Sequence, residues 1–337
     1  MNDNTPDDTL TRRKFLKRSA KAATAAAAAC LVGYRFHDRY GPQKAALPVS
    51  DRHLPNFAIP GMAPRVAVAR GNDRVKNLTT AIEALGGIDH FITSGDRVLL
   101  KVNAAFAAPP ILGATTHPDL VSEVARMCFN AGAETVMVTD NPINDPASSF
   151  ELTGIAEATR GAGAQIVLPR DDLFAAVSVD GGRLIRRWPV LYAPVSRANK
   201  LIGLATVKDH HRSGASLVMK NWYGLLGGRR NIFHQDIHTV IKELAMMVQP
   251  TLVVLDGSVS MMTNGPTGGS LSDLKSTETM IVGTDQVAVD ALGAELLDRT
   301  VDSLPFVAMA ESAGVGSRSA EIIDLRSSSS DRVGASG

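Results

Sequence analysis

The chain contains little cysteine and no large excess of charge of either sign. Cys30 and Cys128 are the only cysteines among 337 residues, which is too few for a disulfide framework, a four-thiolate zinc site or the ligands of an iron–sulfur cluster. Lys and Arg total 35 against 34 Asp and Glu, a formal net charge of +1, and no basic stripe occurs outside the N-terminus. This charge balance gives no support to a nucleic-acid-binding protein.

Long hydrophobic runs are also absent from the sequence, yet its composition is that of a globular protein. Hydrophobic residues make up 45% of the chain and charged residues 20%, which excludes a disordered or fibrous protein. A chain of this length buries a large core, as one large domain or two medium ones.

The N-terminus has the features of an export signal. Residues 11–17 read Thr-Arg-Arg-Lys-Phe-Leu-Lys, which resembles the twin-arginine signal, and a mostly alanine run follows over 22–34. That uncharged run has 13 residues, fewer than the ~20 of a membrane-spanning helix. A charged start before a short apolar middle is typical of a signal peptide. We expect a signal peptide and the start of a linker over 1–46; the alternative is an Ala-rich amphipathic helix with a chance Arg-Arg pair.

Export by this route predicts a periplasmic or other extracytoplasmic protein whose first partner is the twin-arginine machinery. No clear cleavage site is present, and Cys30 only loosely resembles a lipoprotein site, so an uncleaved signal that tethers the protein to a membrane stays an alternative. Loss of 1–46 would remove nine basic and four acidic residues and leave a net charge of −4. That charge again disfavours a nucleic-acid partner.

The remaining pattern predicts an α/β fold with a mostly parallel sheet flanked by helices and a hairpin insertion over 176–190. We expect a linker over 47–64, one domain over 65–326 and a disordered tail over 327–337. The predicted strands are 65–69, 97–102, 134–139, 165–168, 200–207, 251–255, 279–282 and 322–325. The predicted helices are 75–85, 117–131 capped by Thr116, 150–160, 215–226, 234–248, 286–297 capped by Asp285, and 306–313.

Ionisable side chains follow four of the predicted strands. The residues at these strand ends are Lys101, Asp140, Lys208 with His210, and Asp256. Ligands of open α/β sheets bind beyond the carboxyl ends of the strands, so neighbouring strands would gather these groups in one crevice. Such a set suits a small anionic ligand, or proton transfer at a carbon next to a carbonyl. The alternative is that loops are simply polar.

The sequence allows two interpretations of each of two irregular segments and of one pair of histidines. The uncharged segment 102–116 is either a lid or pocket wall, or a buried connection, and the Gly-rich stretch 264–269 is either a ligand-binding loop or a plain turn. His234 and His238, four residues apart on a predicted helix, are candidate metal ligands, although that spacing also arises by chance. Phosphate-loop, dinucleotide and serine-elbow motifs are missing from the sequence.

Many short motifs together resemble the family known as domain of unknown function 362, over about residues 65–325. They are Lys101-Val102-Asn103, Thr115-Thr116-His117-Pro118, Ala131-Gly132-Ala133, Asp140, Lys208-Asp209-His210, Ser216 to Asn221 with Gly224, His234, Asp256, Gly265-Pro266 with Gly268-Gly269, and Asp285 to Asp290. The resemblance implies an uncharacterised α/β domain. It also implies shared polar positions at Lys101, Asn103, His117, Lys208, His210, Lys220, Asn221, His234, Asp256 and Asp290. Members often carry an appended ferredoxin module with iron–sulfur cysteines, which this chain lacks.

These features predict an exported protein that binds and transforms a small anionic substrate, while its cofactor, if any, is unknown. Catalysis is assigned to Lys208, His210, His234 and Asp256. Substrate binding is assigned to Lys101, Asn103, His117, Asp140, Lys220, Asn221, Gly265 and Gly268. The alternative is a non-catalytic protein that handles a metal or redox cofactor or assists assembly.

Overall fold

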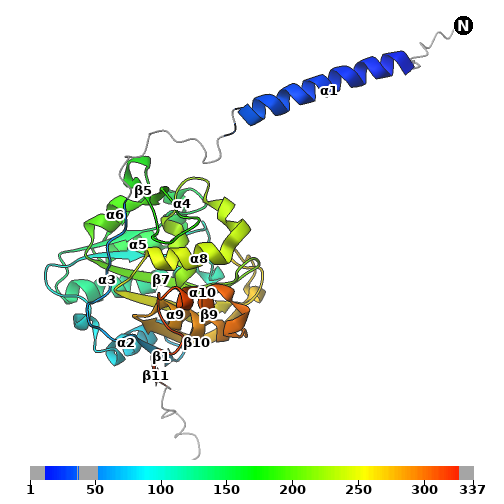
Figure 1. The fold of residues 1–337 in the computed structure, drawn as a ribbon. Coiled ribbons are helices and arrows are strands. Elements are labelled where there is room, and N and C mark those ends of the chain that lie inside the picture. The colour runs from blue at the N-terminus through cyan, green and yellow to red at the C-terminus, as the bar shows by residue number, and fades with distance from the viewer. Residues whose placement is uncertain (1–11, 36, 38–51, 326–337) are drawn as a thin grey trace, which may run out of the picture. The chain divides into compact units, whose positions relative to one another are not determined.

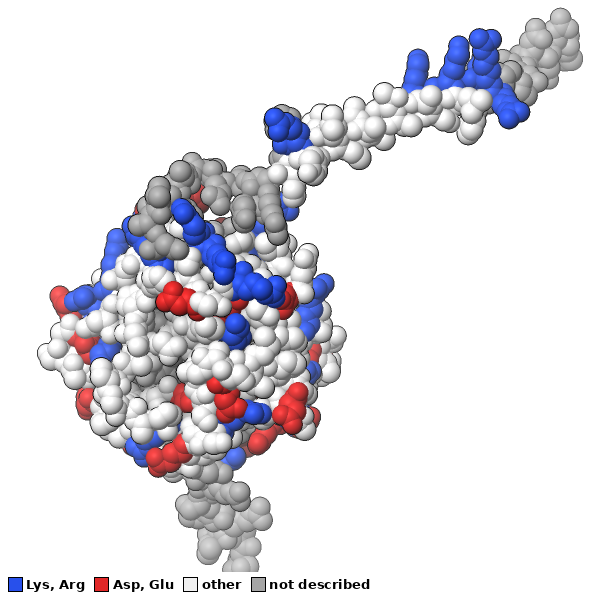
Figure 2. Space-filling model, in the orientation of Figure 1, with Lys and Arg blue, Asp and Glu red and all other residues white. Residues whose placement is uncertain are grey.

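The computed structural model describes residues 12–35, 37 and 52–325, and the chain divides into two compact units, Met1–Lys44 and Ala45–Gly337. In the first unit, Arg12–Arg35 form the exposed helix α1, with most of its basic residues toward its amino end (Figures 1 and 2). Within the described ranges, no helix has both the length and the apolarity required to cross a membrane.

The second unit is built on a mixed sheet in which most strands are parallel. The strand order is β11-β1-β10-β9-β7-β2-β3-β4, and β8 pairs with β7. The bounds are β1 Arg65–Arg70, β2 Arg97–Lys101, β3 Thr135–Thr139, β4 Gln165–Val167, β7 Lys200–His210, β8 Gly214–Ser216, β9 Leu252–Met261, β10 Leu274–Gly283 and β11 Glu321–Leu325. Only β8 and β10 run against the other strands of this sheet. The predicted α/β class is confirmed.

The predicted hairpin is also present, as a separate two-stranded antiparallel sheet of β5 (Phe174–Val177) and β6 (Trp188–Leu191). The helices of this unit are α2 Arg74–Ala84, α3 Pro118–Asn130, α4 Pro146–Leu152, α5 Ile155–Gly161, α6 Tyr192–Arg197, α7 Val218–Asn221, α8 Ile237–Met247, α9 Gln286–Glu295 and α10 Pro305–Ser312. Short 3₁₀ turns are η1 Ile88–His90, η2 Pro110–Leu112, η3 Asp171–Leu173, η4 Trp222–Leu225, η5 Arg230–Asp236, η6 Leu271–Asp273 and η7 Val301–Ser303.

Hydrophobic cores cover both faces of the large sheet. Along β7, Ile202 and Leu204 belong to the core beneath α2, α3 and α5, whereas Leu201 and Ala205 belong to the core beneath α7 to α10. Figure 1 shows α8, α9 and α10 gathered over the central strands. Burial on both faces explains why β7 reads as an apolar run and not as an alternating one.

Residues 52–64, which lie in the predicted linker, pack against the domain. Arg52 bridges to Val177, Asn56 bridges to Gln249, and Phe57 is buried. The other predicted linker residues, 47–51, and the predicted tail, 327–337, lie outside the described part of the chain.

Three local predictions are wrong. Residues 215–226 do not form one helix but the end of β8, the four-residue α7 and the turn η4. The predicted helix 150–160 is two helices, because Gly154 takes a left-handed φ of 72° between α4 and α5. The cap of α3 is His117, whose Nδ1 accepts the Asp119 N–H, while Thr116 donates to the Leu204 carbonyl oxygen at 2.9 Å. The cap predicted at Asp285 is confirmed.

Candidate functional site

A buried ion pair joins the carboxyl ends of two neighbouring strands. Lys101 ends β2 and Asp140 follows β3, and their Nζ and Oδ1 atoms lie 2.7 Å apart. Asp140 also accepts the N–H groups of Ala104 at 2.6 Å and Asn141 at 2.9 Å. Burial lowers the pKa of Lys101, while Asp140 opposes that shift. The Lys101 charge is therefore largely compensated within the protein.

Lys208 reaches the same edge because β7 continues past the end of β2. Its side chain is fully buried, its Nζ donates to the Ala114 carbonyl oxygen at 2.5 Å, and the ammonium lies 5.6 Å from the centre of the Phe106 ring. Burial and, after it, the neighbouring charge of Lys220 lower the pKa of Lys208 to about 7. Ala114 and Phe106 both belong to the segment 102–116, so this segment covers Lys208.

Lys220 is a buried amine with no hydrogen-bond acceptor and no ion-pair partner among residues 12–35, 37 and 52–325. Its Nζ lies over the Tyr223 ring, 5.5 Å from the ring centre. Burial, followed by the charge of Arg230, lowers its pKa to about 8. Burial of an ammonium without a hydrogen-bond acceptor is costly, and the Tyr223 ring is the partner that the described residues provide.

The position of Lys220 depends on a buried carboxyl group from another helix. Asp290 of α9 accepts the N–H groups of Val218 at 2.8 Å and Met219 at 3.2 Å. Asn221, the next residue after Lys220, donates through Nδ2 to the carbonyl oxygens of Lys101 and Leu204. Burial raises the pKa of Asp290 to about 8. These contacts fix α7 over the end of β2 and the middle of β7.

Two histidines stand beside the lysines with stacked rings whose centres are 5.8 Å apart. Nδ1 of His210 accepts the N–H groups of Arg212 at 3.3 Å and Ser213 at 3.2 Å, so Nε2 carries the proton. Burial, with Lys220 as the next cause, lowers the pKa of His210 to about 2. His210 is therefore a neutral residue whose Nε2–H can only donate.

His234 has the opposite tautomer. Tyr223 donates its hydroxyl proton to the Arg230 carbonyl oxygen, so the Tyr223 oxygen, 3.1 Å from His234 Nδ1, accepts. The Asn231 carbonyl oxygen, 3.3 Å from the same nitrogen, also accepts. Nδ1 therefore carries the proton and Nε2 keeps a lone pair. Burial lowers the pKa of His234, which favours this neutral form.

We call Lys101, Asp140, Lys208, His210, Lys220, Tyr223, Arg230 and His234 the cationic cluster. Its formal charges are four cations against the single carboxylate of Asp140, since both histidines are neutral. The Arg230 guanidinium joins two loops by donating to the carbonyl oxygens of Asn141 at 2.7 Å and Leu226 at 3.0 Å.

The sequence did not predict two members of the cluster, Tyr223 and Arg230. Tyr223 lies two residues after the Lys220-Asn221 motif, and this position could have indicated it. No sequence motif includes Arg230.

Gly224 packs directly against the ion pair of Lys101 and Asp140. A Cβ atom at this position would overlap Asp140 Oδ1 and would lie 2.7 Å from Lys101 Nζ. Its carbonyl oxygen accepts the Asn141 N–H at 2.9 Å. The ion pair therefore requires glycine here because no space is left for a side chain.

Asp256 and His117 make their contacts outside the cationic cluster. Asp256 pairs with Arg74 of α2 at 2.9 Å and accepts the Ser258 N–H. Burial lowers the pKa of His117, with Arg74 as the second cause. Asp256 thus forms a second polar group with Arg74 and His117. Asn103 lies at the start of the covering segment, where its N–H donates to Thr116 Oγ1 at 2.7 Å.

Gly265 and Gly268 also contact residues other than those of the cluster. The Gly265 N–H donates to Asp209 at 3.3 Å, and a Cβ at Gly268 would meet Met261. His238 stacks on Phe306, whereas His234 faces Tyr223, so these two histidines have different surroundings. Within the described ranges, no group of three or more His, Cys, Asp or Glu is arranged to hold a metal ion.

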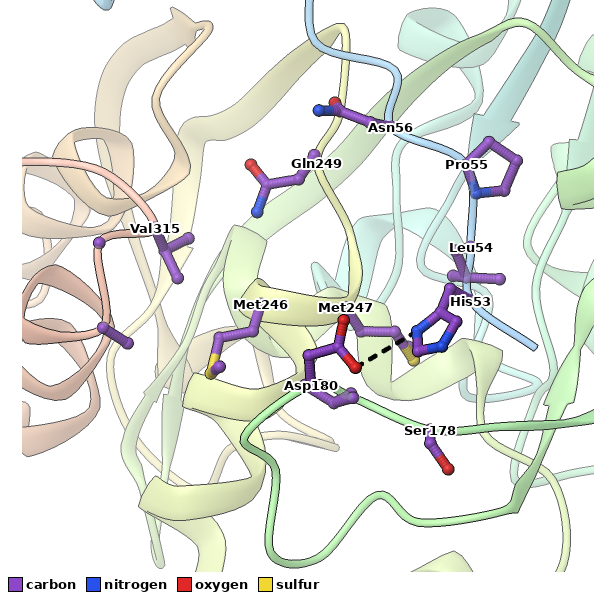
Figure 3. A pocket seen from close by; sticks show the side chains of 13 residues that line it. His53, Leu54, Pro55, Asn56, Ser178, Asp180, Met246, Met247, Gln249 and Val315 are labelled. Atoms are coloured by element: carbon purple, nitrogen blue, oxygen red, sulfur yellow. Dashed lines mark ion pairs between the residues drawn. The ribbon is translucent and has the colours of Figure 1, made fainter. Parts of the chain in front are cut away.

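A pocket of about 320 Å³ lies beside the end of α8 and the residues that precede β9, with Met246, Met247 and Gln249 in its wall (Figure 3). Its walls include Leu54, Met246 and Val315, and its one ion pair joins His53 to Asp180 at 3.9 Å. None of the cationic cluster lines this pocket.

Comparisons with known proteins give one family and two further similarities. Residues 98–295 match the family described as "Domain of unknown function (DUF362)". The "Thylakoid-associated protein sll1697" of Synechocystis is 26% identical over 254 residues, which cover 73% of this chain and 77% of that protein. The lactate racemase apoprotein of Thermoanaerobacterium thermosaccharolyticum has a TM-score of 0.37 at 11% identity. That match covers 72% of this chain and 58% of the racemase chain, less than two thirds of its length.

Proposed function

This chain belongs to the family Domain of unknown function (DUF362), and we propose that it binds and transforms a small anionic substrate at the cationic cluster. The observation that carries the proposal is the Lys220 ammonium, which is buried and without an acceptor in the described structure. Burial is the larger cause of the lowered Lys208 pKa, and repulsion from the nearby Lys220 ammonium is the next. A carboxylate, sulfate or phosphate oxygen between these two amines would relieve that repulsion and supply the missing acceptor.

The two histidine tautomers suit proton transfer in one direction. His234 offers the Nε2 lone pair and acts as the general base, and the neutral His210 offers its Nε2–H as a hydrogen-bond donor to the substrate oxygen that gains charge. Both histidines are neutral at pH 7 because burial lowers their pKa values. Tyr223 positions His234 by accepting the proton on Nδ1.

Lys101, Asp140 and Asn221 act as positioning residues in this proposal. The ion pair of Lys101 with Asp140 and the two Asn221 amide bonds to backbone carbonyl oxygens hold the strand ends and α7 together. Asp256, His117, Gly265 and Gly268 have no contact with the cluster's side chains in the described structure, so we assign them no part in binding the anion.

Export by the twin-arginine route is part of the same proposal. The basic start of α1 and its uncharged alanine-rich middle support it. The relative from Synechocystis is called thylakoid-associated, which is compatible with an exported or membrane-associated protein. The proposed partners are the twin-arginine machinery and the small anion, and no nucleic acid. Membrane association through an uncleaved signal stays an alternative.

Calorimetric titration of the full chain with sulfate tests the anion site. We expect saturable binding that weakens at least tenfold in Lys220→Met, and unchanged binding in Lys76→Met, which removes an exposed lysine of α2. Equal affinities in the wild type and Lys220→Met would contradict the site.

Deuterium uptake tests the proton transfer. Small carboxylic acids with a hydrogen on the carbon next to a carbonyl are incubated with the protein in D₂O, and exchange is followed by NMR. We expect exchange for at least one such acid and its loss in His234→Gln. Anion binding without any exchange across the series would favour the non-catalytic alternative.

A further inference from the structure

The environments of Lys208 and Lys220 differ in a way that gives the two amines different chemistry. Lys208 has an acceptor, the Ala114 carbonyl oxygen, which takes one of its N–H groups and leaves a lone pair when the amine is neutral. Lys220 has no such acceptor in the described chain and needs an anion. Burial and, after it, the charges of Lys220 and Lys101 lower the pKa of Lys208, whereas Asp140 opposes that shift.

We propose that Lys208 is a nucleophile that forms an imine with the carbonyl carbon of a 2-oxo acid, while Lys220 pairs with the acid's carboxylate. The inference rests on the anion site proposed above and adds its substrate class, a carboxylate that carries a neighbouring carbonyl group. An amine made nucleophilic by burial and by an adjacent ammonium is a known device for this chemistry. The fully buried position of Lys208 under Phe106 and Ala114 also excludes the water that would hydrolyse the imine.

The proposed step balances without an oxidant or reductant. The nitrogen lone pair of Lys208 attacks the carbonyl carbon, and the carbonyl π electrons move to oxygen. His234 Nε2 takes one proton from the nitrogen and returns it to that oxygen, which gives the carbinolamine. The nitrogen lone pair then expels the hydroxyl group while the remaining N–H proton passes through His234 Nε2 to the departing oxygen, so that water leaves. His210 Nε2–H donates a hydrogen bond to that oxygen throughout. One C–O double bond and two N–H bonds are replaced by a C–N double bond and one water molecule.

Reductive trapping of the full chain tests the imine. The protein is incubated with pyruvate and cyanoborohydride, digested, and each lysine peptide is quantified by mass spectrometry. We expect the adduct on Lys208 to form at least tenfold faster than on the exposed Lys76. Labelling of Lys208 at or below the rate of Lys76 would overturn the proposal, as would preferential labelling of Lys220.

Two variants and a second carbonyl compound separate this proposal from the anion site. Lys208→Arg should abolish the adduct, and its circular dichroism spectrum and cooperative urea unfolding should show that the variant is folded. Lys220→Met should slow trapping by pyruvate at least tenfold more than it slows trapping by acetone, which has no carboxylate and responds only to the loss of the neighbouring charge. If sulfate binds but neither compound labels Lys208, the imine fails and the anion site stands. If both label Lys208 equally in the wild type, the carboxylate role of Lys220 fails.

Discussion

Lys101 and Asp140 form a buried ion pair of 2.7 Å between the ends of two adjacent parallel strands. In the sheet, Lys101 is in register with Thr139, the residue just before Asp140. The pair therefore follows directly from the strand register, and it anchors the edge at which Lys208, Lys220 and the two histidines gather.

Removal of one member of this pair should be strongly destabilising. Lys101→Met leaves the Asp140 carboxylate buried without its cation, which costs about 3–5 kcal/mol of unfolding free energy. Urea denaturation measures this cost. Adding Asp140→Asn should recover part of it, because the new amide oxygen still accepts a backbone N–H. A loss below about 1 kcal/mol in Lys101→Met would contradict the role given to the pair.

Gly224→Ala should disturb the same pair by steric overlap. The new methyl group would meet both Asp140 and Lys101, and we expect a loss of about 2–4 kcal/mol in unfolding free energy. Gly161→Ala is the matched control, since a Cβ there meets no atom within 4 Å. Its stability should stay within about 1 kcal/mol of the wild type. Equal effects at the two positions would refute the claim of close contact.

Sulfate affinity should fall as pH rises above neutrality. The pKa values of Lys208 and Lys220 are lowered to about 7 and about 8, so both amines lose their protons in that range. Because the anion needs the charged forms, binding takes up protons, and affinity should drop up to about tenfold per pH unit for each proton taken up. Calorimetry from pH 6.5 to 9.5 measures this, with sulfate fully ionised throughout. An affinity independent of pH would contradict the assignment.

The same lowered pKa values predict the opposite trend for the stability of the free protein. The unfolded state holds protons on these lysines up to a pKa of about 10.5, whereas the folded state releases them near pH 7 and 8. The unfolded state thus binds more protons in this window, so unfolding free energy should rise with pH. The difference curve between the wild type and Lys220→Met isolates the contribution of Lys220.

Tyr223→Phe should affect proton transfer more than anion binding. The variant removes the oxygen that accepts the proton on His234 Nδ1 and leaves only the more distant Asn231 carbonyl oxygen. We expect deuterium exchange to slow by about ten- to a hundredfold, with sulfate affinity within twofold. Nitrogen NMR of the imidazole should report a smaller Nδ1–H population. Tyr192→Phe, on α6, serves as the control and should leave all three readouts unchanged.

Much of the fold followed from local patterns in the sequence. Apolar strand runs such as 97–102 and helix signals such as the Asp285 cap depend on neighbouring residues, and the structure has the elements where they were expected. The segment 215–226 was wrong because tertiary contacts override its helical pattern. Asp290 accepts the Val218 N–H, so α7 begins only at Val218. Trp222 packs onto Gly203 of β7, where a side chain larger than that of glycine would have no space.

The site was only partly visible in the sequence for the same reason. Strand ends correctly placed Lys101, Asp140, Lys208 and His210 at one edge, because parallel strands share that edge. Asp256 ends up paired with Arg74, a residue 182 positions away that no motif connects to it. Arg230 and Tyr223 act through backbone carbonyl oxygens and a single hydroxyl group, and such contacts leave no spacing pattern in a sequence.

A crystal structure of the protein grown with sulfate would show the anion site itself. We expect a sulfate oxygen within hydrogen-bonding distance of Lys220 Nζ, with Lys208 on the other side of the anion. A Lys220 amine paired with a carboxylate of the protein itself, and sulfate bound only outside the cationic cluster, would contradict that site.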